Sequence, residues 1–189
     1  MKRAFQIDFL KSVGLQPAHY LLDVGCGTLR GGIPLIDYLE RGHYYGLEVR
    51  AEVLDEGRRE LEEAGLAHKA PVLIHAEHLS AVTIDQRFDI VWGFSVLIHM
   101  TDEIADACLA LVARQLAPDG SFFANVNIGE RTEGRWQGFP VVWRPPGFYE
   151  QLAERNGLHV SALGTLGELG HISGKQTADL QPMLRFVPR

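Results

Sequence analysis

Cysteine is scarce in this sequence, with two such residues among 189, and basic residues do not outnumber acidic ones. Cys26 lies in a glycine-rich stretch and Cys108 in a run with helical periodicity, so their placement predicts no disulfide framework. The cytoplasm, a reducing compartment, fits this cysteine usage best. The formal net charge of −6 offers no basic field to a phosphate backbone, so we expect no nucleic acid partner.

Long apolar runs and metal-binding spacings are also missing. No window reaches the length that a membrane span needs, and Gln6 and Asp8 interrupt the apolar N-terminus before the core of a signal peptide is complete. No histidine pair has the spacing of a helical zinc site, and His75 and His78 have no third partner in sequence. We therefore expect neither a membrane segment nor a metal site.

The composition is that of one soluble globular domain. The chain has 46% hydrophobic and 22% charged residues, which is ordinary for a single core of this length. We expect one domain over residues 1–189, opening with a helical segment at 1–17 that is too short to be a separate recognition domain. A small ligand is favoured over a macromolecule, and the chain is expected to be a monomer or a homodimer.

Apolar runs alternate with amphipathic ones, which is typical of a parallel sheet with helices on both faces. The pattern predicts helices at 30–41, 50–64, 101–117 and 146–156, the third with Thr101 as its N-cap. Residues 166–178 read as a hairpin loop, so the last strand should run antiparallel to its neighbour. The predicted strands cover residues 19–24, 43–48, 71–76, 87–94, 120–128, 158–165 and 180–187.

Residues 129–147 show no sustained period and contain glycines, prolines and aromatic residues. A loop of this length in a compact domain is usually functional, so we interpret it as a substrate loop. Trp136, Phe139 and Trp143 would wall a pocket for a flat or apolar acceptor, since sugars and aromatic groups both stack on such rings. The alternative is that these side chains only anchor the loop to the core.

The stretch 21–32, LLDVGCGTLRGG, reads as a strand that enters a glycine-rich turn and leaves as a helix. Its glycine spacing is one residue too long for the dinucleotide fingerprint G-x-G-x-x-G. Asp23, two positions before Gly25, would repel a pyrophosphate but suits a cationic ligand such as the ammonium and sulfonium of S-adenosylmethionine. Glu48, at the end of the second strand, is placed to accept two ribose hydroxyls, although a solvated carboxylate is the alternative.

Four motifs in order, LLDVGCG, GLE, FDIVWGFSVLIHM and LAPDGSFF, resemble those of class I S-adenosylmethionine-dependent methyltransferases. The first motif continues as LRGG, as in a subgroup of small bacterial enzymes. The resemblance implies an α/β fold, a three-layer αβα sandwich with a Rossmann-like seven-stranded sheet in order 3-2-1-4-5-7-6 and strand 7 antiparallel.

The resemblance also implies a set of cofactor contacts. The acid and the glycines of the first motif would hold the methionine moiety, and the acid of the second motif would hold the ribose. Ala76 and Glu77, after the third strand, would meet the adenine edge. Phe94 and Ser95, after the fourth strand, would lie beneath the sulfonium. His75 departs from the pattern, because similar proteins often have an aspartate there. The expected cofactor-binding residues are Asp23, Gly25, Cys26, Gly27, Arg30, Glu48, Ala76, Glu77, Phe94 and Ser95.

Methyl transfer needs alignment of the acceptor and a base only where the acceptor keeps its proton. His99, just past the fourth strand, is the candidate base, and a structural role is the alternative. Asn125, Asn127 and His171 are weaker candidates for the role of base, and His171, in the last hairpin loop, is also a candidate substrate contact. We expect methyl transfer from S-adenosylmethionine to a small molecule, directed to oxygen on a sugar or natural-product-like metabolite. A catalytically silent cofactor-binding regulator and a nucleotide-cofactor oxidoreductase are the alternatives.

Overall fold

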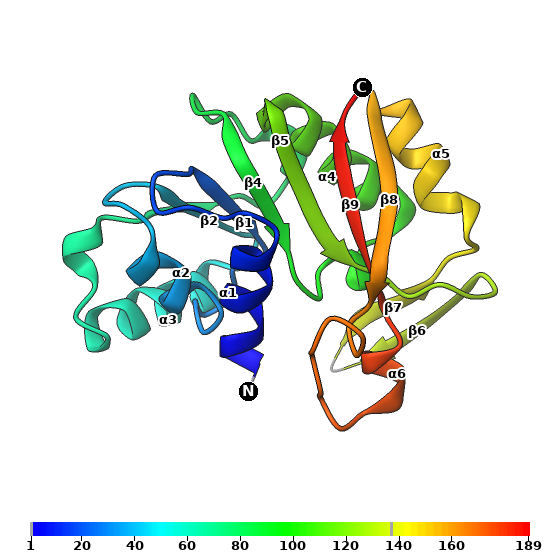
Figure 1. Ribbon diagram of the computed structural model, residues 1–189, viewed down its shortest axis with the longest axis horizontal. Coiled ribbons are helices and arrows are strands. Elements are labelled where there is room, and N and C mark those ends of the chain that lie inside the picture. The colour runs from blue at the N-terminus through cyan, green and yellow to red at the C-terminus, as the bar shows by residue number, and fades with distance from the viewer. Residues whose placement is uncertain (1, 137) are drawn as a thin grey trace.

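The computed structural model describes residues 2–136 and 138–189, without the side chains of residues 2, 3 and 136. Its main sheet has seven strands in the order β3-β2-β1-β4-β5-β9-β8, and β9 runs antiparallel to both of its neighbours (Figure 1). With the separate β6–β7 pair left out of the count, this is the predicted order, which is confirmed. The sheet strands are β1 (Leu21–Val24), β2 (Tyr44–Glu48), β3 (Val72–His75), β4 (Phe88–Gly93), β5 (Leu116–Asn125), β8 (Leu158–Thr165) and β9 (Pro182–Pro188).

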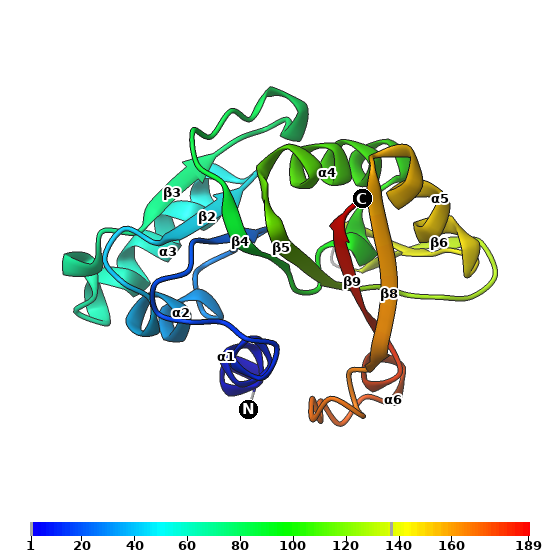
Figure 2. The same ribbon diagram turned by 45° about the horizontal axis from the view of Figure 1, so that its top comes forward.

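Helices cover both faces of the sheet, with α1 and α2 on one side and α4 and α5 on the other (Figure 2). Successive strand residues point to opposite faces, so Leu21 packs with the α1 side and Leu22 with the α4 side. No helix in the described ranges is long and apolar enough to cross a membrane. The helices are α1 (Lys2–Ser12), α2 (Gly32–Tyr38), α3 (Ala51–Glu63), η1 (Ala67–Lys69), η2 (Leu79–Ala81), η3 (Leu97–His99), α4 (Asp102–Gln115), α5 (Gly147–Arg155) and α6 (Gln176–Asp179).

The start of α4 follows the sequence signal, and its end does not. The Thr101 hydroxyl accepts a hydrogen bond from the Ile104 N–H, so the predicted N-cap is confirmed. The chain becomes extended at Leu116, which pairs with Phe88, four residues before the predicted strand. The segment 118–120, at the junction of the predicted helix and the predicted strand, therefore lies at an irregularity within β5.

Residues 129–147 are more regular than predicted. They contain β6 (Thr132–Trp136) and β7 (Phe139–Trp143), an antiparallel pair outside the main sheet. Gly138 has φ of +86°, the conformation that tight hairpin turns require. The prediction of an irregular loop was wrong, because the prolines and glycines of this segment hide the alternation that normally marks a strand.

A core substitution tests the face covered by α4 and α5. Phe122 is fully buried on β5 and stacks on Phe186 at a centroid distance of 5.3 Å. We expect Phe122→Ala to lower the free energy of unfolding by about 3–5 kcal/mol, because it leaves a cavity that the sheet cannot close. Urea denaturation followed by tryptophan fluorescence measures this. The control, Ile172→Ala at a side chain that is 73% exposed, should change the value by less than about 0.5 kcal/mol.

Candidate functional site

A cavity of about 710 Å³ opens at the carboxyl ends of the central strands, where ligands bind in open α/β sheets. The ends of β1 and β2, the turn after β3 and the segment after β4 form most of its wall. The first two turns of α4 contribute Glu103, Ile104 and Ala107, and the hairpin contributes Phe139. The volume lies within the range of small-molecule and cofactor sites.

The glycine turn after β1 is closely packed against the segment after β4. Gly25 has φ of +72°, and a Cβ there would lie 2.7 Å from Val96 Cγ2. The Gly25 N–H donates to the Leu47 carbonyl at 2.7 Å, which fixes the turn to β2. Only glycine combines this backbone conformation with so close an approach, so the first glycine of the turn shapes the cavity wall.

Glu48 lies at the centre of the site with its carboxylate almost fully surrounded by donors. The residue is 4% exposed and lines the cavity. Its Oε1 accepts the N–H groups of Val49 and Arg50 at 3.1 Å each and Arg50 Nε at 3.2 Å. Its Oε2 accepts the Gly27 N–H alone, at 3.1 Å. A carboxylate oxygen offers two lone pairs, so Oε2 is the atom with room for a ligand hydroxyl.

Asp23 is a buried acid on β1 with a single strong partner. The Tyr44 hydroxyl donates to its Oδ2 at 2.7 Å, and the residue is 5% exposed. Burial raises the pKa of Asp23 to about 7, since desolvation disfavours the charged form; the Tyr44 hydrogen bond opposes this and the charge of Glu48 adds to it. Asp23 is therefore poised between its neutral and ionised forms near neutral pH.

His99 joins the segment after β4 to the hairpin. Its Nδ1 lies 2.6 Å from the Pro140 carbonyl oxygen, and its ring lies 6.1 Å from that of Phe139. A carbonyl only accepts, so Nδ1 carries the hydrogen and Nε2 is the basic nitrogen of the neutral ring. The bond to Pro140 holds the segment after β4 against the hairpin, which is a structural role. It also fixes the tautomer that a base requires, and His99 lines the cavity where such a base would act.

The structure brings seven of the predicted residues to the cavity wall, namely Gly25, Arg30, Glu48, Glu77, Ser95, His99 and Phe139. Within the described part of the chain, the other predicted residues are not among those that line the cavity, and their expected contacts with the cofactor or the acceptor stay predictions. Burial raises the pKa of the Cys26 thiol, which stays neutral and packs toward Gly46. The predicted residues outside the wall are Asp23, Cys26, Gly27, Ala76, Phe94, Trp143 and His171, and the side chain of Trp136 lies outside the described residues.

His171 and Phe94 pack against the N-terminal helix. The His171 ring lies 4.9 Å from the Phe5 ring and 5.4 Å from the Phe94 ring. His171 is 5% exposed, and its Nδ1 is 3.7 Å from Asp179 Oδ1, too far for a hydrogen bond. The sequence could not reveal this cluster, because its members come from α1, the end of β4 and the loop before α6.

Sequence reasoning missed Arg50, which lies between β2 and the hairpin. Its Nε bonds to Glu48, and its guanidinium lies 4.9 Å from the centroid of the Phe139 ring. A guanidinium over a ring face is attracted by the ring quadrupole, so Arg50 links the two walls of the cavity. The only signal in the sequence was its place two residues after the acid of the second motif.

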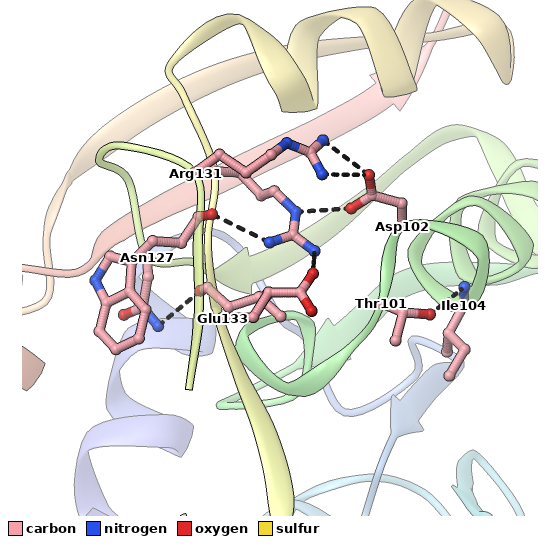
Figure 3. A network of polar contacts seen from close by, with 9 residues as sticks. Thr101, Asp102, Ile104, Asn127, Arg131 and Glu133 are labelled. Carbon is pink, nitrogen blue, oxygen red and sulfur yellow. Dashed lines mark hydrogen bonds and ion pairs between the residues drawn. The ribbon is translucent and has the colours of Figure 1, made fainter. Parts of the chain in front are cut away.

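An ion network around Arg144 attaches the hairpin to the start of α4, and Figure 3 shows its members Asp102, Arg131 and Glu133. Arg144 is 1% exposed; its Nε donates to Asp102 at 2.7 Å and its Nη2 to Glu133 at 3.1 Å. Arg131 donates twice to the other oxygen of Asp102, at 2.8 Å. Removing one partner would strand a buried charge, so this ion network fixes the hairpin against the cavity wall.

The described residues contain no group of three or more histidine, cysteine, aspartate or glutamate side chains that could hold a metal ion. The groups that could hold the expected S-adenosylmethionine are therefore the glycine turn and the acids. Beside the glycine turn, Glu48 Oε2 retains one acceptor position, which is what a ribose hydroxyl of such a nucleoside ligand requires.

Comparison with known proteins gives the class. The family described as "Methyltransferase domain" matches residues 21–120, so the chain belongs to that family and is an S-adenosylmethionine-dependent methyltransferase. The predicted family, enzyme class and cofactor are confirmed. The match covers the sheet from β1 to the middle of β5, together with the glycine turn, Glu48 and His99. No curated protein matches the chain.

Solved structures agree in fold at low sequence identity. The glycopeptide N-methyltransferase MtfA complexed with S-adenosyl-L-methionine is 18% identical over 99% of this chain and 94% of its own, with a TM-score of 0.76. Magnesium protoporphyrin IX methyltransferase (ChlM) from Synechocystis PCC 6803 is 17% identical over 98% and 77%, with a TM-score of 0.70. The CcbJ methyltransferase from Streptomyces caelestis is 14% identical over 97% and 89%, with a TM-score of 0.71.

The state of Asp23 has a measurable effect on stability. Its pKa is raised in the folded chain, so the native state binds a proton more tightly than the unfolded state does. We expect the free energy of unfolding to fall as the pH rises from about 4 to about 7, by up to about 1.4 kcal/mol per pH unit. Asp23→Asn keeps the Tyr44 bond and removes this slope. Equal slopes in both proteins, by urea denaturation at several pH values, would contradict the assignment.

Proposed function

We propose that this protein transfers a methyl group from S-adenosylmethionine to the oxygen of a small-molecule acceptor, a sugar or natural-product-like metabolite. The observation that carries the proposal is that Gly25, Glu48 and His99 line one cavity. These residues supply a backbone turn, a hydroxyl acceptor and a base within the same space. The acidic net charge agrees with a small acceptor and gives no support to a nucleic acid substrate.

The cofactor would be held by residues from three strand ends. Glu48 Oε2 would accept a ribose hydroxyl, because it has one protein donor where Oε1 has three. Glu77, after β3, would face the adenine edge, and Arg30 would meet the carboxylate of the methionine moiety. Asp23 lies one residue before the lining residue Val24, so its charge would favour the ligand ammonium through the field instead of direct contact.

Bound S-adenosylmethionine supplies an electrophilic methyl group on a sulfonium. The protein would align the acceptor oxygen and exclude water, and His99 Nε2 would take the hydroxyl proton as the acceptor is methylated. The Pro140 carbonyl holds Nδ1 protonated, so Nε2 is the nitrogen that receives the proton. Phe139 and Ile104 give the cavity apolar surface on the hairpin and α4 sides, where a sugar ring or an aromatic acceptor can pack.

Two features of the solved relatives bear on the acceptor. MtfA is described as a glycopeptide N-methyltransferase and ChlM as a magnesium protoporphyrin IX methyltransferase, and both are named for acceptors smaller than a protein or nucleic acid chain. An amine acceptor differs from a hydroxyl in needing no base once it has lost its proton. Removal of the His99 base should therefore slow methyl transfer to a hydroxyl that keeps its proton more than transfer to a free amine.

Calorimetric titration with S-adenosylhomocysteine tests the cofactor site. We expect Glu48→Gln to weaken binding by about tenfold to a hundredfold, because the amide nitrogen replaces an acceptor and faces the donors of Gly27 or Arg50. Glu63→Gln, on the exposed end of α3, is the matched control and should bind like the wild type. A folded wild-type protein that binds neither S-adenosylhomocysteine nor S-adenosylmethionine would overturn the proposed function.

His99→Asn tests the base without releasing the hairpin. The asparagine Nδ2 can replace the Nδ1–H bond to Pro140 and supplies no basic nitrogen. With a hydroxyl acceptor found by screening, we expect kcat to fall by about 10²–10⁴-fold while S-adenosylhomocysteine affinity is unchanged. An unchanged kcat would exclude His99 as the base for that acceptor. Cofactor binding without turnover across sugars, phenols and amines would favour a silent binding protein instead.

A further inference from the structure

Three side-chain amides form a continuous hydrogen-bonded chain between two walls of the cavity. Asn125 Nδ2 donates to Gln181 Oε1 at 2.6 Å, and Gln181 Nε2 donates to Asn127 Oδ1 at 2.8 Å. Asn125 is fully buried and Asn127 is 6% exposed. We refer to Asn125, Gln181 and Asn127 as the amide chain. Asn125 is the last residue of β5, Asn127 lies two residues beyond it, and Gln181 immediately precedes β9.

Both ends of the amide chain are bonded to the backbone. The Ser95 N–H donates to Asn125 Oδ1 at 2.6 Å, and Asn127 Nδ2 donates to the Val142 carbonyl at 3.1 Å. Figure 3 shows Asn127 beside the hairpin. A backbone N–H only donates and a carbonyl only accepts, so the two ends fix the direction of every amide between them. One arrangement of the three amides satisfies all four bonds, and turning any amide breaks at least one.

The two ends are places where the cavity wall needs support. Ser95 lines the cavity and has φ of +59°, a left-handed conformation that a residue with a side chain adopts at a cost. Val142 belongs to β7, the strand that contributes Phe139 to the wall and Pro140 to the His99 bond. The amide chain therefore connects a strained residue after β4 to the hairpin on the opposite side.

We propose that Asn125, Gln181 and Asn127 are positioning residues that couple the hairpin wall to Ser95. None of the three is in the cavity wall of the described chain, so they act through the two backbone groups that they hold. A displaced hairpin would release Val142, turn the amides and free the Ser95 N–H. The inference rests on the proposed function for what the cavity binds, and the coupling itself is a property of the protein without ligands.

Amide hydrogen exchange, followed by NMR on ¹⁵N-labelled protein without cofactor, tests the coupling. In Asn127→Leu the last two bonds are lost, although residue 127 has no hydrogen bond to Ser95. We expect the Ser95 N–H to exchange at least about tenfold faster relative to the buried Leu111 N–H of α4. Asn156→Leu removes a comparable amide that bonds to Asp106 and should leave this ratio unchanged.

Gln181→Glu separates positioning from general loss of structure. A protonated glutamic acid accepts from Asn125 through its carbonyl and donates to Asn127 through its hydroxyl, which restores the wild-type direction. The ionised form only accepts and faces Asn127 Oδ1. Relative to the wild type at the same pH, Ser95 exchange should be normal near pH 3.3 (about one unit below an ordinary glutamate pKa) and about tenfold faster near pH 8.

Two results would overturn the coupling. The first is an Asn127→Leu protein in which the exchange rate of the Ser95 N–H relative to the Leu111 N–H is unchanged. The second is a Gln181→Glu protein in which Ser95 exchange does not depend on pH relative to the wild type, because it either matches the wild type at both pH values or is faster by the same factor at both. Gln181→Met, uncharged and at a partly exposed position, gives the pH-independent reference for a broken chain. Because no cofactor is present, failure here is distinct from failure of the wild type to bind S-adenosylhomocysteine, which would overturn the proposed function alone.

Discussion

The carboxylate of Glu48 ties together three parts of the chain, and the cavity depends on it. It accepts the Gly27 N–H from the turn after β1, the N–H groups of Val49 and Arg50 at the start of α3, and the Arg50 side chain. A buried carboxylate is tolerated only where donors replace water, so these bonds must form together. The parallel register of Val24 with Leu47 brings the turn to within reach of this acid. Loss of that register would therefore disrupt the conformation of the glycine turn and also displace Glu48 from the site.

The two buried acids of the site differ in how their charge is compensated. Glu48 accepts four hydrogen bonds, whereas Asp23 accepts one from Tyr44 and has a pKa raised to about 7 by burial. An acid left partly uncompensated inside a protein lowers stability when it ionises, and such groups concentrate at functional sites. Ionised Asp23 therefore favours a positive charge near the glycine turn. Its ionisation lowers the free energy of unfolding, and a bound cation would offset that loss.

The sequence predicted the parts of the fold that have short-range signals, and it failed where contacts are distant. Alternating apolar runs gave the strands and the major helices, and Thr101 marked the start of α4. Arg144, whose partners lie 42 and 11 residues away, has no local signature, and the hairpin that it anchors was predicted as a loop. Phe94 and His171 both pack against Phe5 of α1, a contact between distant segments that no short-range pattern predicts. Asn125 and Asn127 were visible as an alternation on β5, although their common partner at residue 181 was not.

The β6–β7 hairpin enters and leaves the fold at nearly the same point. The Gly129 N–H donates to the Arg144 carbonyl at 3.0 Å, and the Arg144 N–H donates to the Asn127 carbonyl at 3.2 Å, so its base is closed by two backbone bonds. Its two strands form a sheet of their own and lend the main sheet no hydrogen-bond partner. An insertion with adjoining ends can change in length and sequence without moving the strands on either side of it. In evolutionary terms the hairpin is a replaceable module: residues 132–143 can diverge while the strand ends that line the cavity remain under separate selection.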